Sequence, residues 1–179
     1  MAGIDSQSPL EEIAALVSQA LVRAGVSATL SGGGAVTIYA ENLYLSGDLD
    51  FVTTAQLKRI VAAIEPLGFV RSPGAREFTH PGTRFYVEFP PGPLGFGDTV
   101  VSDDDATTLE TAFGPIRIVT PTQLVMDRLA AYVHWNDNPS FDQALMVVRK
   151  QPIDWPELYA WAERDRIDRA VVEKLKAKA

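Results

Sequence analysis

The sequence predicts an α+β protein, with a mixed β-sheet flanked by helices and a helical C-terminal portion after it. Up to about residue 119, short stretches that alternate polar and apolar residues are interspersed with stretches of helical periodicity. After that point three helix-start signals follow one another, each with an acid or amide three residues after the cap, at Thr120, Ser140 and Asp154. We therefore expect an α/β domain at residues 1–119 and a helical portion at 120–179 packed on it.

The α/β part opens with a helix that Ser8 and Pro9 start and Gly25 ends. The pattern then predicts a strand at 27–30, a helix at 35–40, a strand at 48–52, a helix at 55–66 capped by Thr54, and a strand from 68. Two hairpins follow, 77–79 with 83–89 and 107–112 with 116–119, each around a turn rich in Gly and Pro.

The composition limits the chemistry that the chain can perform. Its 179 residues, 46% of them hydrophobic, are enough for one domain with a sizeable core. The chain has no cysteine, which excludes disulfides, thiolate metal sites and a cysteine nucleophile, and its two histidines exclude a His-rich metal site. Any metal must therefore be held mainly by oxygen atoms.

Charge is distributed unevenly along the chain. The net charge is −7, and residues 1–148 carry 8 basic against 17 acidic side chains. Such a body repels a phosphate backbone, which disfavours nucleic acid as a partner. No stretch approaches the ~18 apolar residues of a membrane span, and the N-terminus lacks a signal-like pattern, so we expect a cytoplasmic protein without a membrane partner.

The most informative stretch is LSGGGAVTIYAENLYLSGDLDFV at residues 30–52. Ser31, Gly32 and Gly33 stand between a strand and a helix, where glycine allows backbone N–H groups to face a phosphate closely. Asp48 and Asp50 lie on one face of the next strand, because side chains alternate along a strand. Paired carboxylates are ligands for Mg²⁺, which commonly bridges to substrate phosphates. The stretch therefore predicts a metal-dependent nucleotide site.

A third acid is expected on a later strand. In residues 84–89 the alternation places Arg84, Tyr86 and Glu88 on the face opposite the apolar side chains. Glu88 is our candidate for a general base or a third metal ligand, and Arg84, on the same face, for a phosphate contact. Asp98 and the run 103–105 are alternatives for the third acid. Arg128 either binds a phosphate or pairs with one of the carboxylates.

These motifs resemble the nucleotidyltransferase superfamily, in which a Gly-Gly or Gly-Ser pair precedes an Asp-x-Asp strand. GGGAV followed by SGDLDF is most similar to bacterial nucleotidyltransferase-like proteins that include the AbiEii-type toxins, and residues 124–145 loosely resemble the helical segment of those toxins. The resemblance implies Mg²⁺ ligands at Asp48, Asp50 and Glu88, and phosphate contacts at Ser31, Gly32 and Gly33.

The function implied by the resemblance is transfer of a nucleoside monophosphate from an NTP to a hydroxyl of a protein, an RNA such as tRNA, or a small molecule. A toxin–antitoxin role would add an antitoxin partner, and a homodimer is the other assembly considered. The toxin pattern often has an Arg two residues before the serine of R-x-S-x-D-x-D, where this chain has Tyr44, and a Lys in the later helix, where it has Asp127 and Arg128. These departures favour the alternative, a catalytically weakened module that binds nucleotide or protein.

Other nucleotide and nucleophile motifs are absent from the sequence. SGGGAV does not match the G-x-G-x-x-G fingerprint of dinucleotide-binding folds, and no G-x-x-x-x-G-K-[ST] occurs. The chain also has no G-x-S-x-G.

Overall fold

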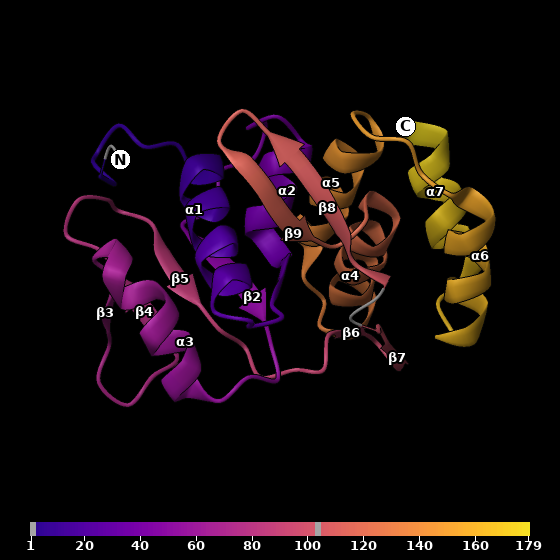
Figure 1. Ribbon diagram of the computed structural model, residues 1–179. Helices are drawn as coiled ribbons and strands as arrows, with labels where there is room; N and C mark the ends of the chain where they lie inside the picture. The colour runs from indigo at the N-terminus through magenta and orange to yellow at the C-terminus, as the bar shows by residue number, and fades with distance from the viewer. Residues whose placement is uncertain (1–2, 103–104) are drawn as a thin grey trace.

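A computed structural model describes residues 3–102 and 105–179 and shows an α+β protein built on a mixed sheet (Figure 1). The strands of this seven-stranded sheet lie in the order β3-β4-β5-β2-β1-β9-β8. Their bounds are β1 Thr29–Ser31, β2 Asp48–Val52, β3 Val70–Arg71, β4 Glu77–Thr79, β5 Tyr86–Glu88, β8 Thr107–Thr111 and β9 Gly114–Ile118. A separate hairpin is formed by β6 Gly95–Phe96 and β7 Thr99–Val100.

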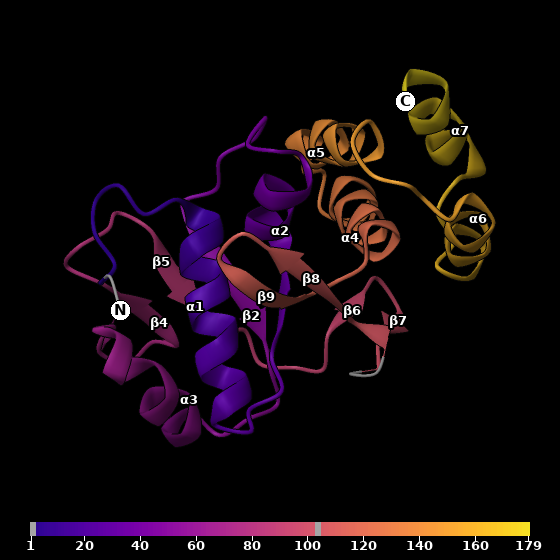
Figure 2. The same cartoon turned by 45° about the horizontal axis from the view of Figure 1, so that its top comes forward.

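Helices surround the sheet, as the sequence predicts. In the described part of the chain they are α1 Leu10–Arg23, α2 Gly32–Tyr39, α3 Leu57–Ile64, α4 Pro121–His134, α5 Asn138–Val148, α6 Trp155–Arg164 and α7 Arg169–Lys178, with a 3₁₀ turn η1 at Glu65–Leu67. Helix α1 packs against β9 and α3, whereas α2 packs against β1 and β2. Both views show α6 and α7 at the end of the molecule away from β3 and β4 (Figures 1 and 2).

The centre of the sheet places the predicted acids side by side. Strand β2 pairs antiparallel with β1, which sets Ser31 opposite Asp50, and parallel with β5, which sets Asp50 opposite Glu88. Along β2, Leu49 and Phe51 are fully buried, whereas Asp48 and Asp50 lie half-buried on the other face. Burial of the apolar face therefore fixes the register that brings the carboxylates together.

Both predicted hairpins are present, and the starts of α1, α2 and α3 differ from expectation. Helix α2 begins at Gly32 rather than Ala35, so the glycines form its first turn. Helix α1 begins after Pro9 without a side-chain cap from Ser8. Helix α3 begins at Leu57, because the Thr53 hydroxyl accepts the N–H of Ala55 and donates to the carbonyl of Ser27, which turns the chain ahead of the helix.

The C-terminal helices follow the predicted order. Thr120 and Gln123 form a reciprocal capping box on α4, and Asp154 caps α6. Helix α5 starts two residues before Ser140, whose hydroxyl donates to Asp137 at 2.6 Å. Helix α4 contacts both α2 and β6, and its residues Asp127 and Arg128 line a cleft beside β2. The division of the chain at residue 119 stays a prediction. Within the described ranges, no helix is both long and apolar enough to cross a membrane.

Candidate active site

Asp48, Asp50 and Glu88 are brought together by the pairing of β2 with β5. Burial first, and then the charges of Asp48 and Glu88, raise the pKa of Asp50 from 3.8 to about 7. Burial, Asp48 and Glu77 also raise the pKa of Glu88. Asp50 and Glu88 therefore resist ionising, and a cation bound beside them would favour their charged forms.

Two hydroxyl groups hold the carboxylate of Asp48. Ser46 donates to Asp48 Oδ1 at 2.5 Å, and Tyr86 donates to Oδ2 at 3.4 Å. Ser46 is itself buried, and its backbone N–H donates to Thr37 Oγ1 at 2.9 Å, which ties the loop to α2. These contacts fix the orientation of Asp48 in the way that outer partners orient metal-binding carboxylates.

The glycines at the start of α2 allow the helix to approach β2 closely. A Cβ at Gly32, where φ is +64°, would lie 2.6 Å from Asp50 Oδ2. A Cβ at Gly33 would lie 2.7 Å from Ser46 Oγ. Only glycine therefore permits the helix N-terminus to stand directly beside the carboxylates, in a position suited to an anion bound near them.

A cleft of about 320 Å³ opens at this point. Its walls come from β1 and the start of α2, from β2, from α4 and from the segment before and into β6; they are Ser31, Gly32, Asp50, Val52, Pro90, Pro91, Pro93, Leu94, Gly95, Asp127 and Arg128. The cleft is therefore lined by the glycine turn, one of the two Asp-x-Asp carboxylates and a cation.

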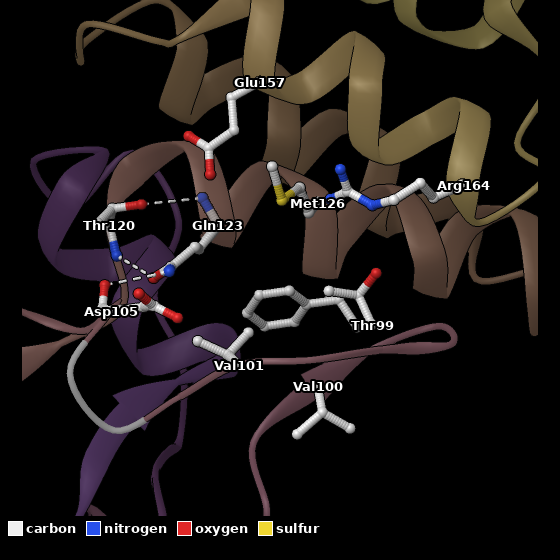
Figure 3. Close-up of a pocket in the computed structure, with 10 residues that line it drawn as sticks. Thr99, Val100, Val101, Asp105, Thr120, Gln123, Met126, Glu157 and Arg164 are labelled. Atoms are coloured by element: carbon white, nitrogen blue, oxygen red, sulfur yellow. Dashed lines mark hydrogen bonds between the residues drawn. The ribbon is translucent and has the colours of Figure 1, made fainter.

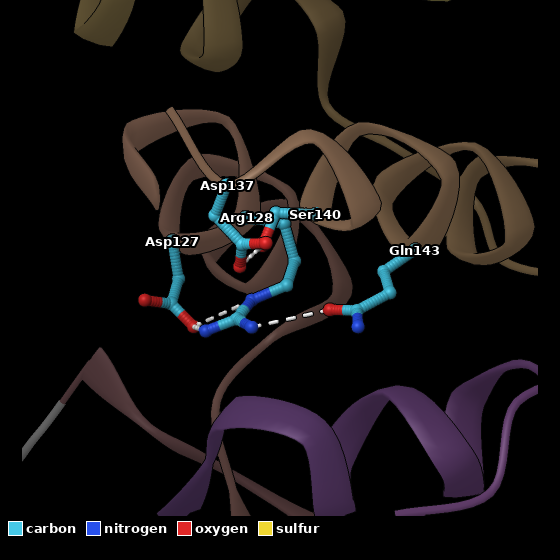
Figure 4. A network of polar contacts seen from close by, with 5 residues as sticks. All are labelled: Asp127, Arg128, Asp137, Ser140 and Gln143. Carbon is cyan, nitrogen blue, oxygen red and sulfur yellow. Dashed lines mark hydrogen bonds and ion pairs between the residues drawn. The ribbon is translucent and has the colours of Figure 1, made fainter. Parts of the chain in front are cut away.

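Arg128 lines the cleft, and it pairs with Asp127 rather than with Asp48, Asp50 or Glu88. Its guanidinium donates to Asp127 Oδ2 from Nη2 at 2.7 Å and from Nε at 3.1 Å, and Nη1 donates to Gln143 Oε1 at 3.1 Å. Figure 4 shows it stretched between these two partners. Its charge lowers the pKa of Asp50, so it acts directly on the carboxylate site.

Asp127 was not predicted, and it changes the interpretation of the glycine turn. The Asp127 carboxylate lies near the backbone N–H of Gly32, which was expected to face a phosphate, and this N–H acts to lower the pKa of Asp127. Burial raises the pKa of Asp127, while Arg128 and this N–H oppose the rise. An internal carboxylate thus lies beside the donor that the sequence assigned to nucleotide phosphate. An acid in the middle of a helix gives no signal of this contact in the sequence.

The remaining predicted residues lie apart from the cleft. Arg84 is exposed, with its guanidinium 5.0 Å from the Phe85 ring centre, and is not among the described residues that line the cleft. Asp98 lies in the turn between β6 and β7, and Asp105 lines a second cavity. Asp103 and Asp104 fall outside the described residues. Glu88 is therefore the alternative that the fold brings beside Asp50.

The donor set suits Mg²⁺, the hard cation that the predicted chemistry requires. Asp48 and Asp50 offer carboxylate oxygens on one strand face, and Mg²⁺ is usually held by one or two carboxylates together with substrate phosphates and water. Among the residues that the structure describes, no group of three or more His, Cys, Asp or Glu side chains is arranged to hold a metal. A pair completed by phosphate oxygens is thus the arrangement that fits.

Comparison with solved structures identifies the fold. An antigenic nucleotidyltransferase-like protein from Paracoccidioides brasiliensis superposes with a TM-score of 0.61 at 16% identity, over 97% of this chain and 94% of that one. The lincosamide antibiotic adenylyltransferase LnuA gives 0.54 at 16% identity over 79% and 97%, and the antibiotic-resistance factor ANT(2″)-Ia gives 0.53 at 14% over 95% and 97%. No family model and no curated protein matches the sequence.

The chain therefore has the fold of these nucleotidyltransferase-like structures, which confirms the predicted fold class. The narrower resemblance to AbiEii-type toxins stays a prediction. The assignment of individual site residues also stays a prediction, and it is taken up below.

Proposed function

We propose that the protein is a Mg²⁺-dependent nucleotidyltransferase that moves a nucleoside monophosphate from an NTP to a hydroxyl group. The observation that carries the proposal is the register of β1, β2 and β5, which sets Asp50 between Ser31 and Glu88 at the mouth of a cleft. The similar solved structures include adenylyltransferases, which supports the same class of reaction.

In this proposal the reaction is an in-line displacement at the α-phosphorus. The acceptor oxygen forms a bond to phosphorus, the bond from phosphorus to the oxygen that bridges to the β-phosphate breaks, and pyrophosphate leaves. Glu88 takes the proton of the acceptor hydroxyl; burial and the charges of Asp48 and Glu77 raise its pKa, which makes it a stronger base. Asp48 and Asp50 would hold Mg²⁺, which when bound neutralises the charge that develops on the phosphate oxygens.

Arg128 is the cation best placed to contact the triphosphate, because it lines the cleft beside Gly32. Its fork geometry allows two parallel hydrogen bonds to phosphate. In the present arrangement Asp127 engages both Arg128 and the N–H of Gly32, so an arriving phosphate competes with this carboxylate for both donors. Ser31 and Gly33 complete the proposed phosphate contacts.

The acceptor that we favour is a small molecule with hydroxyl groups. The acidic body disfavours tRNA, and LnuA was solved with lincomycin bound, which shows that a protein of this fold accommodates such an acceptor. A protein acceptor, an antitoxin partner and a homodimer are the other arrangements that the sequence suggested.

The test is a transfer assay with each α-labelled NTP and Mg²⁺, offered in turn a lincosamide, an aminoglycoside, bulk tRNA and a protein lysate. We expect label in a small-molecule product together with stoichiometric pyrophosphate. Label only in tRNA or protein would change the acceptor class. Absence of transfer and of pyrophosphate in every mixture would contradict the proposal.

A second candidate is a module of this fold that binds nucleotide without turning it over. The contact of Asp127 with Gly32 favours it, because an internal carboxylate weakens the site for triphosphate. Nucleotide binding without pyrophosphate release, in the presence of every acceptor, would select this alternative.

A further inference from the structure

One wall of the cleft belongs to a hairpin that lies outside the main sheet. Leu94 and Gly95 line the cleft, and β6 pairs with β7 through the registers Gly95 with Val100 and Phe96 with Thr99. Each strand has only two residues, and an isolated two-stranded hairpin is marginally stable in water. The position of this wall therefore depends on the contacts that attach the hairpin to the rest of the protein.

The base of the hairpin is attached by apolar packing. Phe96 is 2% exposed, Val101 is 8% exposed, and β6 contacts α4. Beyond this base, a second cavity of about 310 Å³ separates the hairpin from α4 and α6. Figure 3 shows Thr99 and Val100 on one side of it and Met126 and Arg164 on the other. Packing is thus interrupted between the hairpin and the C-terminal helices.

The turn of the hairpin is held instead by Asp165, which comes from the helical portion of the chain. Its carboxylate accepts the backbone N–H of Asp98 at 2.6 Å and the hydroxyl of Thr99 at 2.5 Å. Asp165 is only 3% exposed, and within the described residues no ion pair includes it. Both hydrogen-bond partners therefore belong to the hairpin.

The position of Asp165 is unfavourable for its own helix. It is the C-cap residue of α6, where the helix dipole disfavours a negative charge. The N–H and O–H groups of the hairpin offset this cost. The residue type at this position is thus explained by the hairpin rather than by the helix.

The turn is shaped around this carboxylate. Gly97 has φ of +60°, and a Cβ at that position would lie 2.5 Å from Asp165 Oδ1. Only glycine therefore fits both the backbone conformation and the approach to Asp165. The turn at 97–99 therefore fits closely around Asp165, although the two are far apart in the sequence.

We propose that Asp165 is a positioning residue for the cleft: by binding Asp98 and Thr99 it fixes the hairpin, and with it the wall formed by Leu94 and Gly95 opposite Asp50. A wall held in place before a ligand arrives removes the ordering cost from binding. The effect on nucleotide rests on the proposed function, whereas the effect on the hairpin does not.

The test uses the absence of cysteine from the chain. Two exposed positions, Val100 on the hairpin and Val22 on α1, are changed to cysteine and spin-labelled, and the distance distribution between the labels is measured. The doubly labelled chain is compared with the same chain carrying Asp165→Ala, Thr99→Val or Thr99→Ser. Asp168→Ala is the matched control, since Asp168 caps α7 in the same helical portion.

We expect a single narrow distribution in the parent chain, in Thr99→Ser and in Asp168→Ala, and a broadened one in Asp165→Ala and Thr99→Val. Thr99→Val removes only one hydrogen bond, so it tests the proposal even if Asp165→Ala does not fold. An unchanged distribution in folded Asp165→Ala, or in Thr99→Val, would overturn the proposal.

Calorimetry of Mg²⁺–ATP on the unlabelled variants supplies the second measurement. Loss of the preordered wall should weaken binding roughly three- to tenfold in Thr99→Val, with recovery in Thr99→Ser and no loss in Asp168→Ala. A broadened hairpin with unchanged affinity would overturn the link between Asp165 and the cleft. If the parent chain binds no nucleotide, the proposed function fails, and the label distances still decide whether Asp165 fixes the hairpin.

Discussion

The strand side and the helix side of the candidate site differ in how far the sequence alone predicts their functional residues. On the strand side, Asp48 and Asp50 follow a local alternation, and pairing with β5 adds Glu88 from a neighbouring strand. On the helix side, Asp127 and Arg128 are adjacent in sequence, and their role arises from packing of α4 against α2. The comparison shows that the Asp-x-Asp pair of the strand side can be recognised as a sequence motif, whereas the role of Arg128 on the helix side arises from tertiary contacts.

The largest effect expected is on the strand side. Asp48→Ala removes a proposed Mg²⁺ ligand, so nucleotide transfer should fall by at least about 100-fold while the fold is retained. Transfer of labelled NMP and circular dichroism measure the two quantities. Glu65→Gln, an exposed acid of the 3₁₀ turn, is the control and should keep parental activity. Parental activity in Asp48→Ala would place the chemistry elsewhere.

The pH dependence of stability tests whether burial and the neighbouring carboxylates disfavour ionisation of Asp50 in the folded protein. Folding raises the pKa of Asp50 from 3.8 to about 7, so its favourable contribution is present below about pH 4 and is lost as the pH rises through about 7. Asp50→Asn should therefore be more stable than the parent at pH 8 by about 2–4 kcal/mol without metal, and the gap should shrink toward pH 4.

Urea unfolding at several pH values measures this difference. Added Mg²⁺ should stabilise the parent more at pH 8 than at pH 5, because ionised carboxylates bind the cation. Equal stability of the parent and Asp50→Asn at every pH would show that folding does not disfavour ionisation of Asp50.

On the helix side, Arg128→Gln should weaken Mg²⁺–NTP binding by about tenfold, because one charge-assisted contact to phosphate is lost. Arg84→Gln should change affinity less than about twofold, since Arg84 is exposed and distant from the cleft lining. Calorimetry of Mg²⁺–NTP binding on both variants shows whether Arg128 or Arg84 contributes more to nucleotide affinity. A larger loss in Arg84→Gln would restore the sequence-based assignment of Arg84.

The smallest effect expected is a gain in affinity. Asp127→Asn removes a negative charge that competes with phosphate for Arg128 and Gly32, so nucleotide affinity should rise roughly two- to fivefold. A loss that parallels Arg128→Gln would show instead that Asp127 serves to orient Arg128. The melting temperature separates either result from a loss of folded protein.

The sequence predicted the fold class and the pair of carboxylates on one strand face, because both depend on local periodicity. The polar and apolar alternation of β2 and β5 is such a signal. The contact of Asp127 with Gly32 and the binding of the hairpin turn by Asp165 were not predictable, since each joins segments that the sequence keeps far apart. Helix starts were misplaced where a neighbouring contact, such as that of Thr53 with Ser27, overrides the local cap.

The central claim is that Asp48 and Asp50 form a Mg²⁺-dependent nucleotide site. Calorimetry of ATP, GTP, CTP and UTP, each with and without Mg²⁺, tests it on the parent chain and on Asp48→Ala. The account predicts binding of at least one NTP that requires Mg²⁺ and is lost in Asp48→Ala. Absence of Mg²⁺-dependent binding in the parent, or unchanged binding in Asp48→Ala, would contradict it.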